Sequence, residues 1–155
     1  MQFICKINKN ILGKYKNKII TRDVILTQER LENHILLHHK KDYEQLKPYL
    51  KDIINNPDFI IDDNRHEDTI ILLKEINEIS KHGRIVLKLA LGKNTVYSKN
   101  SIPVFYLINK QNGKNEQIFN KNSIITLMRL NKRTWNQTIK NREDIIFSKH
   151  IDKNE

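Results

Sequence analysis

The sequence predicts an α+β fold in which N-terminal helices pack on an antiparallel β-sheet. Between residues 27 and 55, apolar side chains recur at helical spacing. After the stop signal Asn55-Asn56-Pro57, the pattern changes to short runs rich in β-branched residues, separated by polar turns. Helices that precede a run of neighbouring strands are typical of α+β proteins. The 155 residues contain no internal repeat and no linker, so we expect a single domain over residues 1–155.

The expected helices follow from caps and breakers. Thr27 is a suitable N-cap because its hydroxyl can accept a backbone N–H, and Glu29 favours the first turn. This helix is expected to run to about His39. Asp42 is expected to cap a second helix, which restarts at Pro48 because proline has no N–H to donate.

The expected strands are short. The first, over residues 3–7, is expected at a sheet edge, and a short helix is expected at 133–141. The remaining expected strands are 19–26, 59–61, 69–73, 84–91, 103–109, 123–127 and 144–147.

Charge is distributed unevenly along the chain. The formal net charge is +10, but residues 21–78 carry a net charge of −5, whereas residues 79–155 carry +10. A polyanion bound to the basic second half would gain free energy from counterion release. The alternative is a solvated lysine-rich surface that keeps the protein soluble.

Location is predicted from what the sequence lacks. The lone Cys5 has no internal disulfide partner, which is typical of a reducing compartment. No apolar run approaches the roughly 18 residues of a membrane span, and charges interrupt the N-terminal segment at once. We therefore expect a cytoplasmic protein without a membrane partner.

The first candidate site is the histidine cluster His34-Ile-Leu-Leu-His38-His39. Imidazoles are the side chains best suited to proton transfer near neutral pH. His34 and His38 are four residues apart and share a helix face. This spacing also suits zinc, but the glutamate of the zinc motif and a third ligand are missing, so we expect no metal or cofactor. The alternative is that these histidines are surface or satisfied core residues.

The second candidate site is the late strand Asn122-Ser123-Ile124-Ile125-Thr126. Two hydroxyls are followed by Arg129, Lys132 and Arg133, and hydroxyls with guanidinium groups can hold a phosphate. Lys88 stands in an alternating strand and points to solvent or into a cleft. Trp135 is either a stacking surface for a base or a core residue.

The order of these motifs resembles the phage-type branch of the barnase/EndoU/colicin/RelE-like nucleases. The resemblance is carried by Leu26-Thr27, by His34-Ile35 with His38-His39, by the segment 53–58 ending in Pro-Asp, and by the strand ending in Ile125-Thr126. It covers about residues 20–148, with an apparent insertion near 94–118. The family has Arg before the second histidine and Pro after it, whereas His38 and Lys40 flank His39 here.

The resemblance implies a metal-independent endoribonuclease. In such an enzyme the ribose 2′-OH attacks the adjacent phosphate and leaves a 2′,3′-cyclic phosphate. His34 and His39 would be acid and base by the family pattern, and His34 with His38 by helical geometry. The candidate residues around them are Lys88 and Thr126 as catalytic groups, and Ser123, Arg129, Lys132, Arg133 and Trp135 as substrate-binding groups.

The partner implied by the resemblance is RNA, with tRNA as one candidate. A toxic nuclease would also need a cognate immunity or antitoxin protein. Two other functions compete with this prediction: a non-catalytic basic nucleic-acid-binding module, and a phage protein that captures a host partner through its acidic first half.

Overall fold

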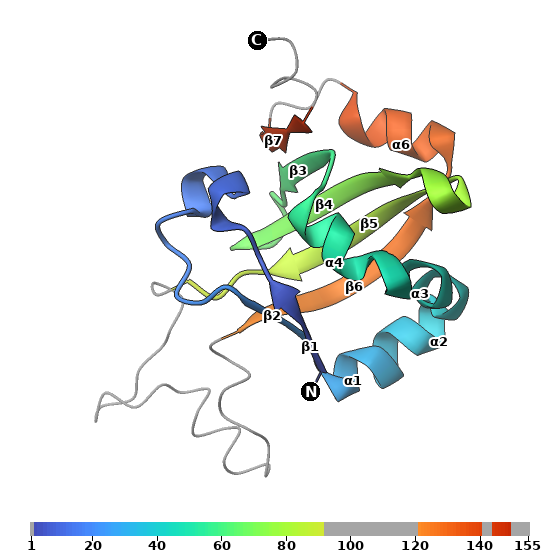
Figure 1. Ribbon diagram of the computed structural model, residues 1–155, viewed down its shortest axis with the longest axis horizontal. Helices are drawn as coiled ribbons and strands as arrows, with labels where there is room; N and C mark the ends of the chain where they lie inside the picture. Colours follow the sequence, from blue (N-terminus) through green and yellow to red (C-terminus); the bar gives the residue numbers. More distant parts are fainter. Residues whose placement is uncertain (1, 92–120, 141–143, 150–155) are drawn as a thin grey trace.

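The computed structural model describes residues 2–91, 121–140 and 144–149, which form a seven-stranded mixed sheet with short helices (Figure 1). The strand order is β1-β2-β6-β5-β4-β3-β7, so the N-terminal strand lies at one edge and the last strand at the other. This confirms the α+β class and the edge position of the first strand. The strands are β1 Gln2–Lys6, β2 Asp23–Leu26, β3 Phe59–Asp62, β4 Thr69–Ile76, β5 Lys81–Lys88, β6 Asn122–Leu130 and β7 Ile145–Ser148.

The expectation of a purely antiparallel sheet is wrong. Strands β3 to β6 form an antiparallel meander, but β6 pairs with β2 in parallel, with Val24 opposite Asn122 and Ile25 opposite Ser123. A parallel pair needs a long crossover connection. Here the crossover contains the early helices and three strands, a long-range pairing that local sequence patterns do not show. The strand expected at 103–109 and the insertion near 94–118 lie outside the described residues.

The first helical segment combines three kinds of turn. The Thr27 hydroxyl accepts the N–H of Arg30, as expected of an N-cap, and α1 (Gln28–Arg30) follows. A π-helical turn, η3 (Leu31–Ile35), comes next and closes with the N–H of Leu36 donating to the carbonyl of Leu31. The segment ends with α2 (Leu36–His38), and the backbone leaves helical geometry at His39, where φ is −137°.

The second helical segment starts one turn earlier than predicted. His39 occupies the cap position of α3 (Lys40–Leu46), so Asp42 lies within the first turn and is not the cap. The Asp42 side chain accepts a hydrogen bond from Arg129 instead of capping the helix. Pro48 restarts the helix as predicted, through the 3-10 turn η4 (Lys47–Tyr49) and then α4 (Leu50–Asn55). The other turns and helices are η1 Lys9–Ile11, η2 Gly13–Tyr15, η5 Asn77–Ile79 and α6 Lys132–Ile139.

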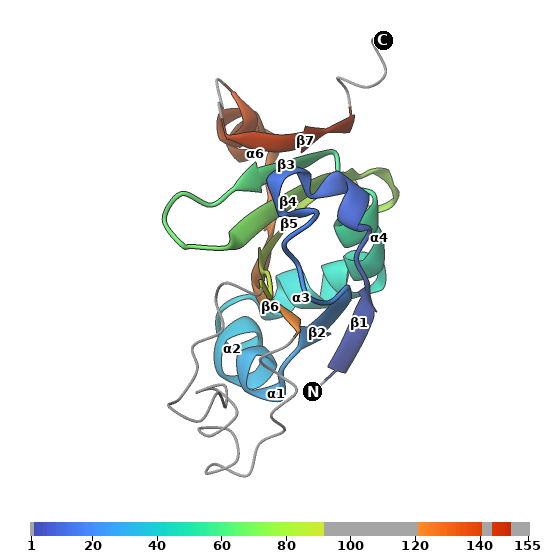
Figure 2. The ribbon, with the colours of Figure 1, turned by 90° about the vertical axis from the view of Figure 1, so that its left-hand side faces the viewer.

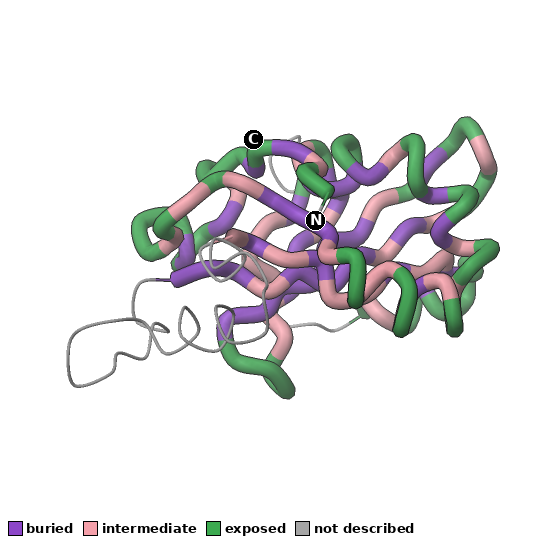
Figure 3. Tube along the Cα trace, turned by 90° about the horizontal axis from the view of Figure 1, so that it is seen from below, coloured by how far each residue is buried: buried purple, intermediate pink, exposed green. Residues whose placement is uncertain are grey.

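The larger hydrophobic cluster joins α3 and α4 to the sheet. Leu46 and Ile53 belong to the same buried cluster as Leu72 and Ile85 of the central strands. Gly83 allows this approach, because a Cβ at that position would lie 2.9 Å from Ile53 Cδ1 and 3.2 Å from Leu46 Cδ2. Figure 2 shows α3 and α4 on one side of the sheet, and Figure 3 shows buried residues concentrated along the strands.

The opposite side of the sheet is only partly covered. Helix α6 lies there, and a smaller cluster includes Ile61, Leu73, Val86 and Trp135 (Figure 2). Alternating residues of the two central strands point to this side, which we call the open face. We define it by Arg84, Val86 and Lys88 of β5 and by Ser123, Thr126 and Met128 of β6, which are paired across the two strands.

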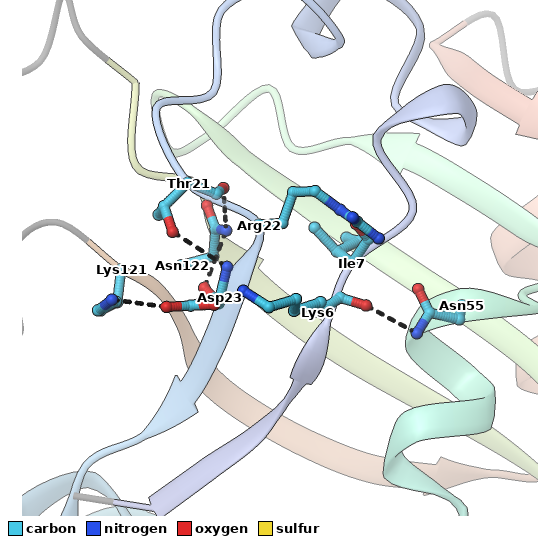
Figure 4. Close-up of polar contacts among 8 residues, drawn as sticks. All are labelled: Lys6, Ile7, Thr21, Arg22, Asp23, Asn55, Lys121 and Asn122. Atoms are coloured by element: carbon cyan, nitrogen blue, oxygen red, sulfur yellow. Dashed lines mark hydrogen bonds and ion pairs between the residues drawn. The ribbon is translucent and has the colours of Figure 1, made fainter.

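A buried amide fixes the start of β6 beside β2. The fully buried Asn122 side chain donates to the carbonyls of Thr21 and Asp23 (Figure 4). It also accepts the N–H of Ala90. Asp23 is also paired with Lys6 and Lys121, and these cations hold the pKa of its carboxyl below the ordinary value. One asparagine therefore anchors the parallel pairing of β6 with β2 at its start. Within the described ranges, no helix has the length and apolar character needed to cross a membrane.

Asn122→Ala is expected to lower the free energy of unfolding by about 3 kcal/mol, because it removes the partner of one buried and two partly buried backbone groups. Urea unfolding followed by circular dichroism measures the change. Asn136→Ala, at an exposed position of α6, is the control and should change stability little. Equal stability of both variants would contradict the structural role of Asn122.

Candidate functional site

Three imidazoles gather at the end of the first helical segment. The ring centroids of His34 and His38 lie 5.5 Å apart, those of His34 and His39 lie 5.9 Å apart, and those of His38 and His39 lie 6.5 Å apart. The π-helical turn contains one residue more than an α-helical turn, and His39 leaves the helix altogether. Both pairings considered from the sequence are therefore brought together in space.

The cluster meets the late strand through His34. Its Nε2 lies 3.2 Å from the hydroxyl oxygen of Thr126, although 92 positions separate the two residues in the chain. Thr126 pairs with Val86 across the central strands and belongs to the open face. The early imidazoles and the late hydroxyl, predicted separately, therefore belong to one site.

The surroundings of His34 favour the neutral form of its imidazole. Partial burial lowers the pKa of its imidazole below the ordinary value of 6.5, and the positive charges of Arg30, His38 and His39 lower it further. A neutral imidazole has a free ring nitrogen that can accept a proton at neutral pH. The environment of His34 therefore suits a general base.

His39 has a carboxylate partner. Its Nδ1 lies 3.5 Å from Asp42 Oδ2, and the other carboxylate oxygen accepts a 2.5 Å hydrogen bond from Arg129 Nε. Asp42 thus links the second helical segment to the end of β6. A carboxylate next to one ring nitrogen can orient the imidazole. The sequence analysis did not identify Asp42 as a site residue, because its position near a helix start suggested an N-cap. The pattern that could have identified it is its i, i+3 spacing from His39.

Lys88 and Ser123 lie on the open face but apart from the imidazoles. They are opposite each other across β5 and β6, beyond the Val86–Thr126 pair. The ammonium of Lys88 donates to the carbonyl of Glu67 in the turn between β3 and β4, at 2.8 Å. The geometry therefore places Lys88 at the border of the site, tied to that turn.

The remaining predicted cations lie at the other end of β6. Arg129 and Lys132 line an open hollow of about 540 Å³ together with Asp42 and His82. Arg133 follows in the exposed first turn of α6, which Asn131 caps. These side chains form a basic border next to the His39–Asp42 pair.

Trp135 is a packing residue. Only 7% of it is exposed, its ring lies 4.6 Å from that of His82, and it meets Phe59 edge-on at 6.0 Å. An indole enclosed in this way has little surface left for a stacked base, which agrees with the core alternative that the sequence left open.

Chemically, the site offers two distinct imidazole environments beside a hydroxyl and a guanidinium. One imidazole is held toward the neutral form, and another is next to a carboxylate; such a difference is typical of acid–base pairs. Among the residues that the structure describes, no group of three or more histidine, cysteine or acidic side chains converges to hold a metal ion.

A comparison with known protein families assigns the chain to one of them. A family model described as "phage-Barnase-EndoU-ColicinE5/D-RelE like nuclease3" matches residues 2–115, which is most of the 155 residues. The chain belongs to this nuclease family. The match includes the three clustered histidines and Lys88, and it ends before β6, which supplies Thr126 and Arg129. No curated protein and no solved structure matches the chain significantly.

The match differs in extent from the resemblance seen in the sequence. It begins at residue 2, where the resemblance began near residue 20, and it runs through most of the segment 94–118. The first strand is thus part of the family pattern. The match therefore covers strands β1 to β5 and helices α1 to α4, and it ends before β6 and α6.

In an NMR titration of the folded protein, we expect the His34 ring signals to have a midpoint below pH 6.5. Arg30→Gln should raise this midpoint by removing a positive charge, whereas Lys51→Gln on the exposed side of α4 should not change it. A midpoint at or above 6.5 would show that the burial of the imidazole does not have the effect described.

Proposed function

We propose that this nuclease cleaves RNA without a metal, by attack of the ribose 2′-OH on the adjacent phosphorus. The P–O5′ bond breaks, leaving a 2′,3′-cyclic phosphate on one product and a 5′-hydroxyl on the other. The observation that carries the proposal is the contact of His34 with Thr126 inside a cluster of three imidazoles. The family supports nuclease chemistry in general, and the substrate and mechanism are our inference.

His34 is the proposed base that takes the proton from the 2′-OH. Its lowered pKa keeps the imidazole neutral at neutral pH, which is the state that can accept a proton. The hydroxyl of Thr126, next to the His34 ring, would turn toward a non-bridging oxygen of the phosphate when substrate is bound. Base and phosphate-binding group would thus act on the same nucleotide.

His39 is the proposed acid that protonates the leaving 5′-oxygen. Asp42, at 3.5 Å from its Nδ1, would orient the ring so that Nε2 faces the leaving group. The centroids of the His34 and His39 rings lie 5.9 Å apart, so both imidazoles would face the same phosphodiester from one side. His38 is more exposed and has no carboxylate partner among the described residues, so we assign it a supporting role through its charge.

Cations around the imidazoles would hold the substrate. Arg129 would stabilise negative charge as it develops on the pentavalent phosphate, since its guanidinium already lies beside Asp42. Lys88, Ser123, Lys132 and Arg133 would contact flanking phosphates. A net charge of +10 supports such contacts with a polyanion.

A toxin-like role in the host cytoplasm, with tRNA as substrate and an immunity or antitoxin protein as partner, completes the proposal. It rests on the phage origin given in the family description and on the basic charge of the chain.

His34→Ala and His39→Ala are each expected to slow RNA cleavage by about 10²–10⁴-fold, because each removes one proton-transfer group. His38→Ala should have a smaller effect. The assay uses purified protein, total RNA and EDTA, with Lys51→Ala as the control for handling and folding. Equal cleavage by all variants would remove the histidines from the mechanism. Salt-dependent RNA binding without any product would favour the non-catalytic binding module.

Asp42→Asn is expected to lower kcat, because the substitution removes the carboxylate that lies 3.5 Å from His39 Nδ1 and orients the proposed acid. Steady-state cleavage kinetics measure the change, and circular dichroism checks that the variant is folded. Asp52→Asn, on the half-exposed side of α4, is the matched control. A kcat as high as that of the control would show that Asp42 does not act on His39.

A further inference from the structure

A second hollow lies on the open face beside the proposed reaction centre. Its volume is about 470 Å³, which is enough for more than a phosphate group. The floor comes from the central strands, one wall from α6 and the other from the turn between β3 and β4. The lining side chains used below are Arg84, Met128, Leu130, Asn64, Thr134 and Thr138.

Arg84 is an unusual cation at the floor of this hollow. Its guanidinium is partly buried, which lowers its pKa, and the nearby charge of Asp63 compensates only in part. Among the described residues, its one hydrogen bond is to the sulfur of Met128, at 3.5 Å, and no carboxylate forms an ion pair with it. Asp63 is itself paired with His66 at 3.1 Å. A partly desolvated guanidinium with free donors is suited to an anionic ligand.

The hollow is next to the contact between His34 and Thr126. Arg84 is opposite Met128, and Val86, two residues further along β5, is opposite Thr126. Side chains related in this diagonal way across a sheet lie roughly 7–8 Å apart. A nucleotide in the hollow would therefore be a neighbour, along the same strand of RNA, of the phosphodiester held by His34 and Thr126.

The lining matches a nucleotide better than a free phosphate. Met128 and Leu130 provide an apolar surface on which a base can lie, while Asn64, Thr134 and Thr138 provide polar groups at the border. The planar donor fork of arginine fits phosphate oxygens in a bidentate manner. The hollow thus combines one anion-binding group with an apolar surface, as a nucleotide requires.

We propose that the Arg84 hollow is a nucleotide subsite that binds the RNA unit adjacent to the cleaved bond, with its phosphate on Arg84. This inference rests on the proposed function for its role in cleavage, but binding itself needs no catalysis. The subsite would hold the substrate in register, so that the 2′-OH of the neighbouring ribose meets His34.

The test is NMR titration of the full chain with each of the four nucleoside 5′-monophosphates, with the matching nucleosides and inorganic phosphate as comparisons. At least one nucleotide is expected to shift the amide signals of Arg84, Met128 and Thr134, with affinity at least tenfold above its nucleoside and above phosphate. Arg84→Gln should weaken that binding at least tenfold. Arg84→Lys, which keeps the charge without the fork, should weaken it less, and Lys51→Gln should leave it unchanged.

The outcomes separate this inference from the proposed function. If no nucleotide shifts signals of the hollow, or if Arg84→Gln and Arg84→Lys both bind as the native protein does, the subsite is wrong even where RNA cleavage depends on His34. A different outcome is that nucleotides bind to the native protein and not to Arg84→Gln, while neither the native protein nor any variant cleaves RNA. In that case the subsite is supported and the proposed nuclease activity is wrong. If Arg84→Gln does not fold, the shift map of the native protein decides alone.

Discussion

The contact between His34 and Thr126 joins the two halves of the site, and the functional account depends on it. It connects a helix from the first quarter of the chain to a strand that begins beyond residue 120. No local interaction brings these segments together. They meet because β6 pairs in parallel with β2, the strand that leads directly into the helix with the histidines. Asn122 holds that pairing at its start, so the position of Thr126 beside His34 also depends on a residue outside the proposed site.

Around this contact, the electrostatic environment distinguishes the histidines. His34 is partly desolvated and surrounded by positive charge, whereas His39 faces Asp42. The same residue type is thus placed in two different environments. Asp42 in turn accepts a hydrogen bond from Arg129, so a residue of β6 is also connected to the second imidazole. The late strand is therefore linked to both of the imidazoles proposed for proton transfer.

Much of the local structure could be predicted because local rules govern it. Thr27 caps its helix, Pro48 restarts the next, and the strands after Pro57 follow their β-branched runs. The order of the strands could not be predicted in the same way. The parallel pairing of β2 with β6 is a long-range event, and no periodicity in either segment encodes its partner.

The sequence predicts which residue types form the candidate site, but it does not predict which of them are in contact. The histidines and Thr126 stand out because their chemistry is rare in a lysine- and isoleucine-rich chain, but Asp42 looks like an ordinary first-turn carboxylate. For Trp135 the sequence left stacking and core packing open, and only its burial in the fold distinguishes the two. Lys88 was placed correctly on its strand, yet its ammonium is bonded to the carbonyl of Glu67, which only the fold can show.

The central claim is that His34 and Thr126 act on one phosphodiester, and a double-mutant cycle on RNA cleavage tests it most directly. The rates of His34→Ala, Thr126→Val and the double variant are compared with that of the native protein. Groups that act together are non-additive, so the double variant is expected to be about as slow as His34→Ala alone. Losses that simply multiply would show that the two side chains act independently, and would contradict a shared reaction centre.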